Sequence, residues 1–136
     1  MEELRKIVQG TLLENEPMSN HTSYGIGGPA DAYITPKDRY DLAEILKFAR
    51  KYSIQTHFVG SGSNLLVADS GIDGIVLTPA KALTQLEFND GHVIAESGVM
   101  LGRLVKECNK RNLTGVESMI GVPGTLGGAL VMNAGA

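Results

Sequence analysis

The chain has 136 residues, of which 43% are hydrophobic and 20% are charged, and its formal net charge is −3. This length is enough for a domain with a buried core. The acidic balance, without a basic run or interleaved aromatic residues, argues against nucleic-acid binding. The 17 glycines gather in short clusters without a repeat, so they indicate tight turns and binding through the backbone.

The lone cysteine, Cys108, excludes an internal disulfide and fits a reducing compartment. The N-terminus is charged from its second residue, and no apolar run approaches the roughly 18 residues that a membrane span requires. We therefore expect a cytoplasmic protein without a membrane partner. The three histidines share no motif spacing with cysteines or carboxylates, so no metal site is expected.

The first eighty residues predict a strand–helix–strand unit, an order typical of a small α/β arrangement. Apolar residues at helical spacing open the chain, and Pro17 ends that segment. Asp38 is placed to cap a second helix. The predicted elements are a helix at 1–15, a strand at 31–35, a helix at 39–52 and strands at 56–59 and 74–78.

The hydrophobic period changes after residue 80. Residues 83–95 alternate apolar and polar side chains around an Asn-Asp-Gly turn, which predicts a β-hairpin. Residues 101–112 then predict a helix whose apolar face includes Cys108 as a buried thiol. We therefore expect an α+β fold with two small subdomains, residues 1–80 and 81–136. Because the chain stops within an apolar stretch of small residues, we expect a fragment or a short relative of a longer protein.

The first of two glycine-rich loops, residues 59–67, is predicted to follow a strand directly. Its N–H groups and polar side chains can bind phosphate oxygens. A Rossmann fingerprint is excluded, because Leu65 stands where the third glycine belongs. No acidic ribose ligand follows at residues 80–82, and no Walker lysine is present. The alternative is a tight turn that binds no ligand.

The second glycine-rich loop, residues 121–129, has the sequence Gly-Val-Pro-Gly-Thr-Leu-Gly-Gly-Ala. Its adjacent glycines permit a flat ring or a phosphate to lie on the backbone, and a helix beginning near Gly127 would add its positive N-terminal end. Close packing of two backbone segments is the alternative. Together the two loops predict one extended, phosphate-bearing ligand held from both sides by main-chain amides.

Three segments occur in a distinctive order: residues 20–31 (Asn-His-Thr-Ser-Tyr-Gly-Ile-Gly-Gly-Pro-Ala-Asp), residues 60–67 and residues 115–136. In this combination they closely resemble the UDP-N-acetylenolpyruvoylglucosamine reductase family, and the resemblance covers essentially the whole chain. It implies an FAD-binding domain of the vanillyl-alcohol oxidase/p-cresol methylhydroxylase type. In such a domain the flavin lies between two small α+β subdomains.

By this resemblance the first loop takes the FAD diphosphate, and the second loop with the stretch near Asn133 approaches the ribityl chain and the isoalloxazine ring. NADPH is implied as co-substrate and a UDP-sugar as substrate, in cell-wall (peptidoglycan) synthesis. The cofactor-binding residues expected on this basis are Phe58, Gly60, Ser61, Gly62, Ser63, Asn64, Leu65, Gly121, Pro123, Gly124, Thr125, Gly127, Gly128, Ala129, Asn133 and Ala134.

The resemblance assigns no catalytic residue to this chain, because the family's catalytic arginine, serine and glutamate lie C-terminal to the matched segment. We therefore expect FAD binding by these residues alone to be weakened or lost, without turnover. Gly62→Val is expected to remove FAD binding and leave the fold largely intact, because a Cβ there would block the diphosphate or forbid a positive φ. The oligomeric state is left open, with a monomer favoured.

Other functions stay open at this point. One is a non-catalytic flavin- or nucleotide-binding module that serves a partner protein. Another is a different FAD oxidoreductase of the same fold, which is disfavoured because such enzymes often attach flavin through His or Cys and neither loop holds one. A scaffold whose glycines only pack is the third.

Overall fold

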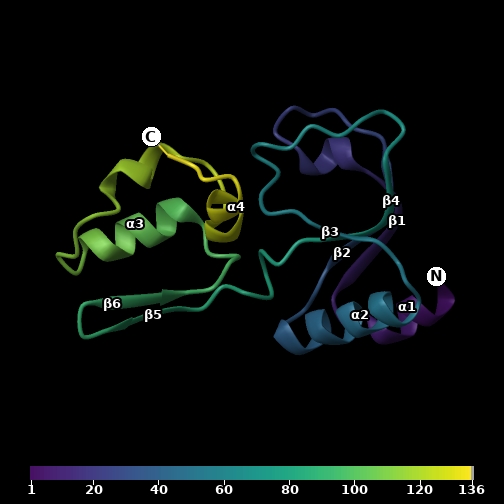
Figure 1. Cartoon of the computed structure of the whole chain (residues 1–136), viewed down its shortest axis with the longest axis horizontal. Helices are drawn as coiled ribbons and strands as arrows, with labels where there is room; N and C mark the ends of the chain where they lie inside the picture. Colours follow the sequence, from purple (N-terminus) through teal and green to yellow (C-terminus); the bar gives the residue numbers. More distant parts are fainter. Residues whose placement is uncertain (136) are drawn as a thin grey trace.

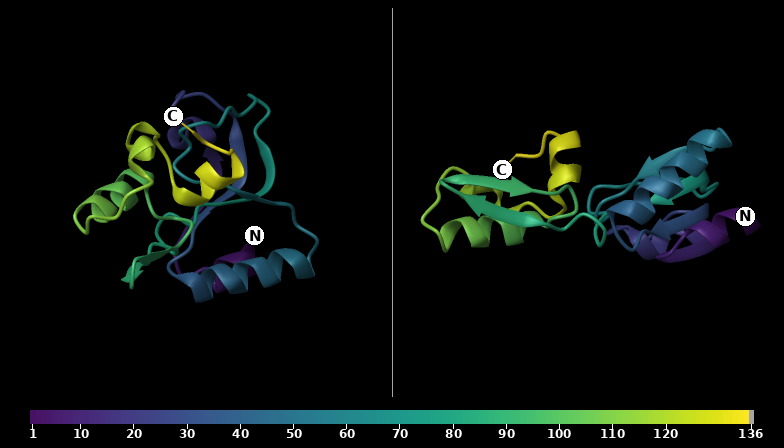
Figure 2. Two further views of the ribbon diagram at one scale, coloured as in Figure 1. Left: turned by 60° about the vertical axis from the view of Figure 1, so that its left-hand side comes forward. Right: turned by 90° about the horizontal axis from the view of Figure 1, so that it is seen from below.

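The computed structural model describes residues 1–135 as two lobes side by side, joined near residue 80 (Figure 1 and Figure 2). Ala136, the last residue of the predicted second subdomain, lies outside the described residues. The N-terminal lobe holds α1 (Glu2–Ile7), β1 (Thr11–Pro17), η1 (Met18–His21), β2 (Pro29–Thr35), α2 (Arg39–Lys51), β3 (Thr56–Phe58) and β4 (Ile72–Leu77). The C-terminal lobe holds β5 (Leu86–Asn89), β6 (His92–Ala95), α3 (Leu101–Asn109), η2 (Glu117–Gly121) and α4 (Leu126–Val131).

The N-terminal lobe is built on a four-stranded sheet in the order β1-β2-β4-β3. β1 pairs antiparallel with β2, and the β2–β4 and β4–β3 pairs are parallel. Helices α1 and α2 cover one face around a core that includes Leu4, Ile34 and Ile45. On the other face Met18 and Val76 belong to a second apolar cluster. That second cluster supports the first glycine-rich loop.

The predicted N-terminal helix is too long, since α1 ends at Ile7 and the chain turns into strand β1 at Thr11. Gly10 makes the turn possible, because a Cβ there would overlap the carbonyl oxygen of Thr35. Leu12 fits helical spacing and also fits the inward face of a strand, and antiparallel pairing with β2 decides the outcome. The other predicted helices and strands are confirmed within a few residues at their ends.

Asp41 fixes the junction between these elements. Its buried carboxylate accepts N–H groups of Gln9, Gly10 and Lys37 at 3.0, 2.9 and 2.8 Å. A buried carboxylate requires such donors. Asp38 caps α2 as predicted, with its Oδ1 accepting the N–H groups of Tyr40 and Asp41 at 2.9 Å each.

The C-terminal lobe packs α3 against the β5–β6 hairpin. The turn at Asp90 and Gly91 has positive φ at both residues, 45° and 79°, which matches the twist of a two-residue hairpin. Cys108 lies in the small core of this lobe, as predicted. Within residues 1–135, none of the helices is both long and apolar enough to cross a membrane.

Candidate functional site

A cleft of about 650 Å³ lies between the two lobes, and both glycine-rich loops line it. α4 lies on the side of the C-terminal lobe that faces the N-terminal lobe (Figure 1). The predicted cofactor-binding residues lie along this cleft except for Gly121 and Asn133. Gly121 ends η2, and Asn133 lines a separate hollow of about 180 Å³ between α3 and α4.

Other residues line the cleft that the sequence did not indicate: Val59, Pro79, Ser97, Val122, Val131 and Met132. Most of them are apolar residues beside the glycine clusters. The exception is Ser97, whose carbonyl oxygen accepts the N–H of Gly127 at 2.8 Å. Val59 and Val122 belong to the two glycine-rich loops, but no local sequence signal marks Pro79 or Ser97, because only the packing of one lobe against the other brings them to the cleft.

The first glycine-rich loop presents unpaired donors to the cleft. Within residues 1–135, no N–H group from Ser61 to Leu65 donates a hydrogen bond to the protein. Gly62 has a φ of +68°, the left-handed conformation from which successive N–H groups converge on an anion. The segment therefore has the geometry of an anion-binding loop rather than of a turn that satisfies itself.

The second glycine-rich loop differs, because the first turn of α4 is already satisfied. The N–H groups of Leu126 and Gly127 donate to the carbonyl oxygens of Val99 and Ser97 at 2.7 and 2.8 Å. Gly128 donates to the Thr125 hydroxyl at 3.3 Å. A helix does begin near Gly127 as predicted, and its first three N–H groups already have acceptors within the protein. Ahead of the helix, the N–H groups of Gly124 and Thr125 donate no hydrogen bond to the protein within residues 1–135, and both residues line the cleft.

The two loops are in direct contact with each other. The Ser63 hydroxyl donates to the carbonyl oxygen of Pro123 at 3.1 Å. Gly60 lies against the buried side chain of Thr125 so closely that a Cβ would overlap the Thr125 hydroxyl. The separation of the loops is thus set by the protein itself before any ligand enters.

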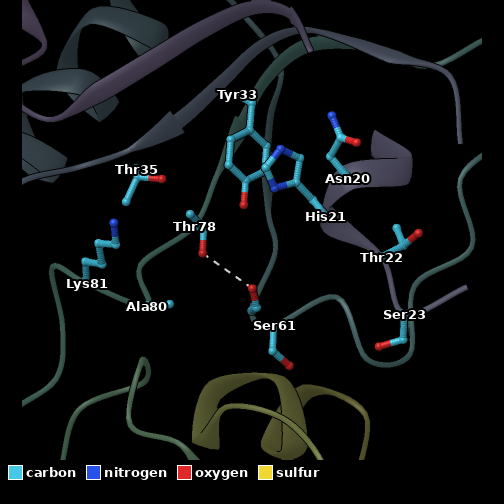
Figure 3. A pocket seen from close by; sticks show the side chains of 11 residues that line it. Asn20, His21, Thr22, Ser23, Tyr33, Thr35, Ser61, Thr78, Ala80 and Lys81 are labelled. Atoms are coloured by element: carbon cyan, nitrogen blue, oxygen red, sulfur yellow. Dashed lines mark hydrogen bonds between the residues drawn. The ribbon is translucent and has the colours of Figure 1, made fainter. Parts of the chain in front are cut away.

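Behind the first loop lies a second hollow, of about 420 Å³, between η1, the sheet and the linker (Figure 3). His21 stacks on Tyr33 there with 3.7 Å between ring centroids, and its Nε2 lies 3.0 Å from a Glu16 carboxylate oxygen. Hydrogen bonds hold the pKa of the Glu16 carboxyl below its usual value, and the bond from Asn20 contributes more than the one with His21. Burial raises the pKa of the Tyr33 hydroxyl.

The cleft has the chemistry of a binding site. Among the described residues, its lining contains no Asp, Glu, His, Lys, Arg, Cys or Tyr side chain. Unpaired N–H donors on one wall and apolar side chains such as Val131 and Met132 elsewhere fit a dinucleotide with a diphosphate and flat rings. FAD is such a molecule, and when bound it supplies hydride-transfer chemistry that these side chains lack.

Comparisons with known proteins agree with this geometry. The family model for the FAD binding domain matches residues 30–136. The UDP-N-acetylenolpyruvoylglucosamine reductase of Bacillus licheniformis is 41% identical over 136 residues, which are 100% of this chain and 45% of the relative. The chain thus spans less than half the length of that relative.

Solved structures give the same picture. The UDP-N-acetylenolpyruvylglucosamine reductase of Thermus caldophilus superposes with a TM-score of 0.68 at 29% identity, over 94% of this chain and 43% of that one. A solvent-stable cholesterol oxidase shares the fold with a TM-score of 0.73 at 16% identity, over 94% of this chain and 25% of that one. The α+β fold and the flavin family predicted from sequence are confirmed: this chain belongs to the FAD binding domain family.

Proposed function

We propose that this chain is the FAD-binding portion of an NADPH-dependent reductase that converts UDP-N-acetylenolpyruvoylglucosamine to UDP-N-acetylmuramate for peptidoglycan synthesis in the cytoplasm. The observation that carries the proposal is the row of unpaired N–H groups on the cleft wall at residues 61–65. The 41% identity to a reductase of that name over the whole chain supports the substrate class.

In this proposal the two lobes are the FAD-binding subdomains, residues 1–80 and 81–136, with the flavin between them. The N–H groups of the first loop hold the diphosphate. The backbone of Gly127 and Gly128, together with Ala129 and Ala134, lies along the flavin and its ribityl chain. Among residues 1–135 the lining has no titratable side chain, so in this proposal these residues hold and orient the cofactor.

A titration with three flavins tests the binding role. FAD, FMN and riboflavin share the ring system, but only FAD carries the diphosphate and adenosine. We expect FAD to bind more tightly than FMN, and FMN more tightly than riboflavin, as followed by quenching of flavin fluorescence. Equal affinities for the three flavins would contradict the assignment of the first loop.

The substrate class is tested in the cells that encode the chain. Depleting the gene product should raise the pool of UDP-N-acetylenolpyruvoylglucosamine and lower that of UDP-N-acetylmuramate, measured by mass spectrometry of UDP-sugars. Unchanged pools alongside intact FAD binding would instead favour a non-catalytic flavin-binding module.

A further inference from the structure

We propose that Thr78 and the segment from His21 to Ser23 are positioning residues for the diphosphate. Thr78 holds the carbonyl group of Gly60, and the His21–Ser23 segment holds that of Gly62, on the side of the loop away from the cleft, and they thereby aim the N–H groups of Ser61 and Ser63 into the cleft. This inference rests on the proposed binding of FAD at the same cleft. It assigns the orientation of the first loop's N–H groups to residues outside both glycine-rich loops.

Thr78 holds the beginning of the loop. Its hydroxyl donates to the carbonyl oxygen of Gly60 at 3.4 Å (Figure 3). Thr78 is only 5% exposed, and its own N–H donates to Ile34 in the middle of the sheet at 3.0 Å. The N–H of Val59 also donates to Leu77 at 2.9 Å. The hydroxyl that bonds to Gly60 is therefore held in place by the backbone hydrogen bonds of the sheet.

The segment at His21–Ser23 holds the middle of the loop. The N–H of Ser23 donates to the carbonyl oxygen of Gly62 at 3.0 Å. Gly62 packs on the carbonyl of His21 so closely that any Cβ would overlap that oxygen. The His21 side chain is anchored in turn by its Glu16 hydrogen bond and its stack on Tyr33. This chain of contacts leads from β1 and β2 to the loop.

The direction of the N–H groups follows from peptide geometry. In a planar trans peptide the C=O and the N–H point in opposite directions. The Gly60 carbonyl points to Thr78, so the N–H of Ser61 points away from it. The Gly62 carbonyl points to Ser23, so the N–H of Ser63 points away as well. Ser61 and Ser63 line the cleft on that other side, and neither N–H has a protein partner within residues 1–135.

The opposite orientation would be unfavourable for an anion. If either peptide flipped, a carbonyl oxygen would face the diphosphate in place of an N–H. The hydrogen bonds to the carbonyl oxygens therefore fix the orientation of these two peptide groups, although Thr78 and Ser23 lie on the far side of the loop from the ligand. Pre-aligned donors bind without a reorganisation cost, which raises affinity.

Three variants separate positioning from general stability. Thr78→Val removes the hydroxyl, with its contacts to the Gly60 carbonyl oxygen and to the Tyr33 hydroxyl, but keeps the shape. Thr78→Ser keeps the hydroxyl and should restore the parent's behaviour. Thr35→Val is the matched control, because Thr35 lines the same hollow and its hydroxyl makes no hydrogen bond among the described residues. Dissociation constants for FAD and for inorganic pyrophosphate are measured for each, with amide resonances followed by ¹⁵N NMR.

We expect pyrophosphate to shift the amide resonances of Ser61 and Ser63 in the parent. Thr78→Val should raise both dissociation constants by about 3- to 10-fold, the loss expected for one hydrogen bond. Thr78→Ser and Thr35→Val should stay near the parent. The melting temperatures of the unliganded variants should be similar, which distinguishes alignment of the loop from a loss of fold.

Equal affinities for Thr78→Val and Thr35→Val would overturn the inference, as would pyrophosphate shifts that spare Ser61 and Ser63. The two proposals fail differently. If the parent binds pyrophosphate at these amides but binds FAD no more tightly than riboflavin, the proposed function fails and the positioning role stands. If FAD binds and Thr78→Val has no effect on either ligand, the positioning role alone fails.

Discussion

The Ser63 hydroxyl and the Pro123 carbonyl oxygen are joined by a 3.1 Å hydrogen bond, although the two residues belong to different lobes. This bond ties the loop that carries the unpaired N–H groups to the loop that leads into α4. Since both loops line the cleft, the bond helps to set its width. The cleft is therefore shaped before the cofactor arrives.

Removing this bond should loosen the cleft. Ser63→Ala is expected to weaken FAD binding by about 3- to 10-fold, equivalent to one lost hydrogen bond, because the loop's N–H groups remain but the loops are less firmly aligned. Fluorescence titration measures the affinity. Ser118→Ala is the control, since Ser118 is exposed on η2 near the second loop. An equal affinity for both variants would show that the bond does not matter.

Gly60 and Thr125 should be energetically coupled. Gly60→Ala is expected to cost about 1–3 kcal/mol in unfolding free energy, because the new methyl group overlaps the Thr125 hydroxyl. Thr125→Ala alone loses the cap of α4 and should cost about 1 kcal/mol. In the double variant the cost of Gly60→Ala should shrink, since the overlapping hydroxyl is gone. Urea denaturation of the parent, the two single variants and the double variant gives the unfolding free energies of this double-mutant cycle. If the costs of the two single substitutions add up to that of the double variant, the two residues are not coupled.

Substitutions at Gly62 and Gly25 distinguish two costs of adding a Cβ: overlap with a neighbouring atom, and a positive φ alone. Both have positive φ, +68° and +66°, but only at Gly62 would a Cβ overlap another atom, the His21 carbonyl oxygen. Gly62→Ala should therefore lower the unfolding free energy more than Gly25→Ala, whose cost should be about 1 kcal/mol. The expectation that a substitution at Gly62 leaves the fold largely intact is wrong for this reason. Similar urea midpoints for the two variants would show that the close approach at Gly62 adds no cost and that the fold tolerates the substitution.

Glu16 gives the protein a defined response to acid. Its pKa is lower in the folded protein than the ordinary value of about 4.3, so its hydrogen bonds stabilise the folded state fully above that value. The stabilisation is lost as the pH falls from about 4.3 through the folded-state pKa. Glu16→Gln should flatten this part of the stability curve. Glu87→Gln, at an exposed strand position, should leave the curve unchanged; a parallel loss in all three proteins would contradict the assignment.

Ile45 should be the more costly truncation on α2. It is fully buried against the sheet, whereas Leu46 is half-buried at the edge of the core. Ile45→Ala should cost about 2–5 kcal/mol, and Leu46→Ala less. Chemical denaturation of both variants measures the difference. A larger loss for Leu46→Ala would mean that the core is centred elsewhere.

Local patterns predicted much of the fold. Asp38 before an amphipathic run predicted α2, and Asn89-Asp90-Gly91 between alternating segments predicted the β5–β6 hairpin. The segment after Gly10 was misassigned because Leu12 satisfies both the helical and the strand period. Pairing with β2, a partner distant in sequence, decides between them, and no local signal carries that information.

The candidate site was predictable where glycine marked it. Glycine-rich segments identified both loops, and they lie together along the cleft. The sequence could not show that the N–H groups of Leu126 and Gly127 bond to Val99 and Ser97. It also could not show that Thr78 supports the first loop, because a single threonine after a strand has no distinguishing pattern.

A crystal structure of the chain grown with FAD tests the central claim most directly. We expect the diphosphate in the cleft between the lobes, with its oxygens within hydrogen-bonding distance, about 2.7–3.2 Å, of the Ser61 and Ser63 nitrogens. We also expect the flavin ring alongside α4. A diphosphate bound elsewhere, or one whose oxygens contact α4 N–H groups while the first loop is empty, would contradict this expectation.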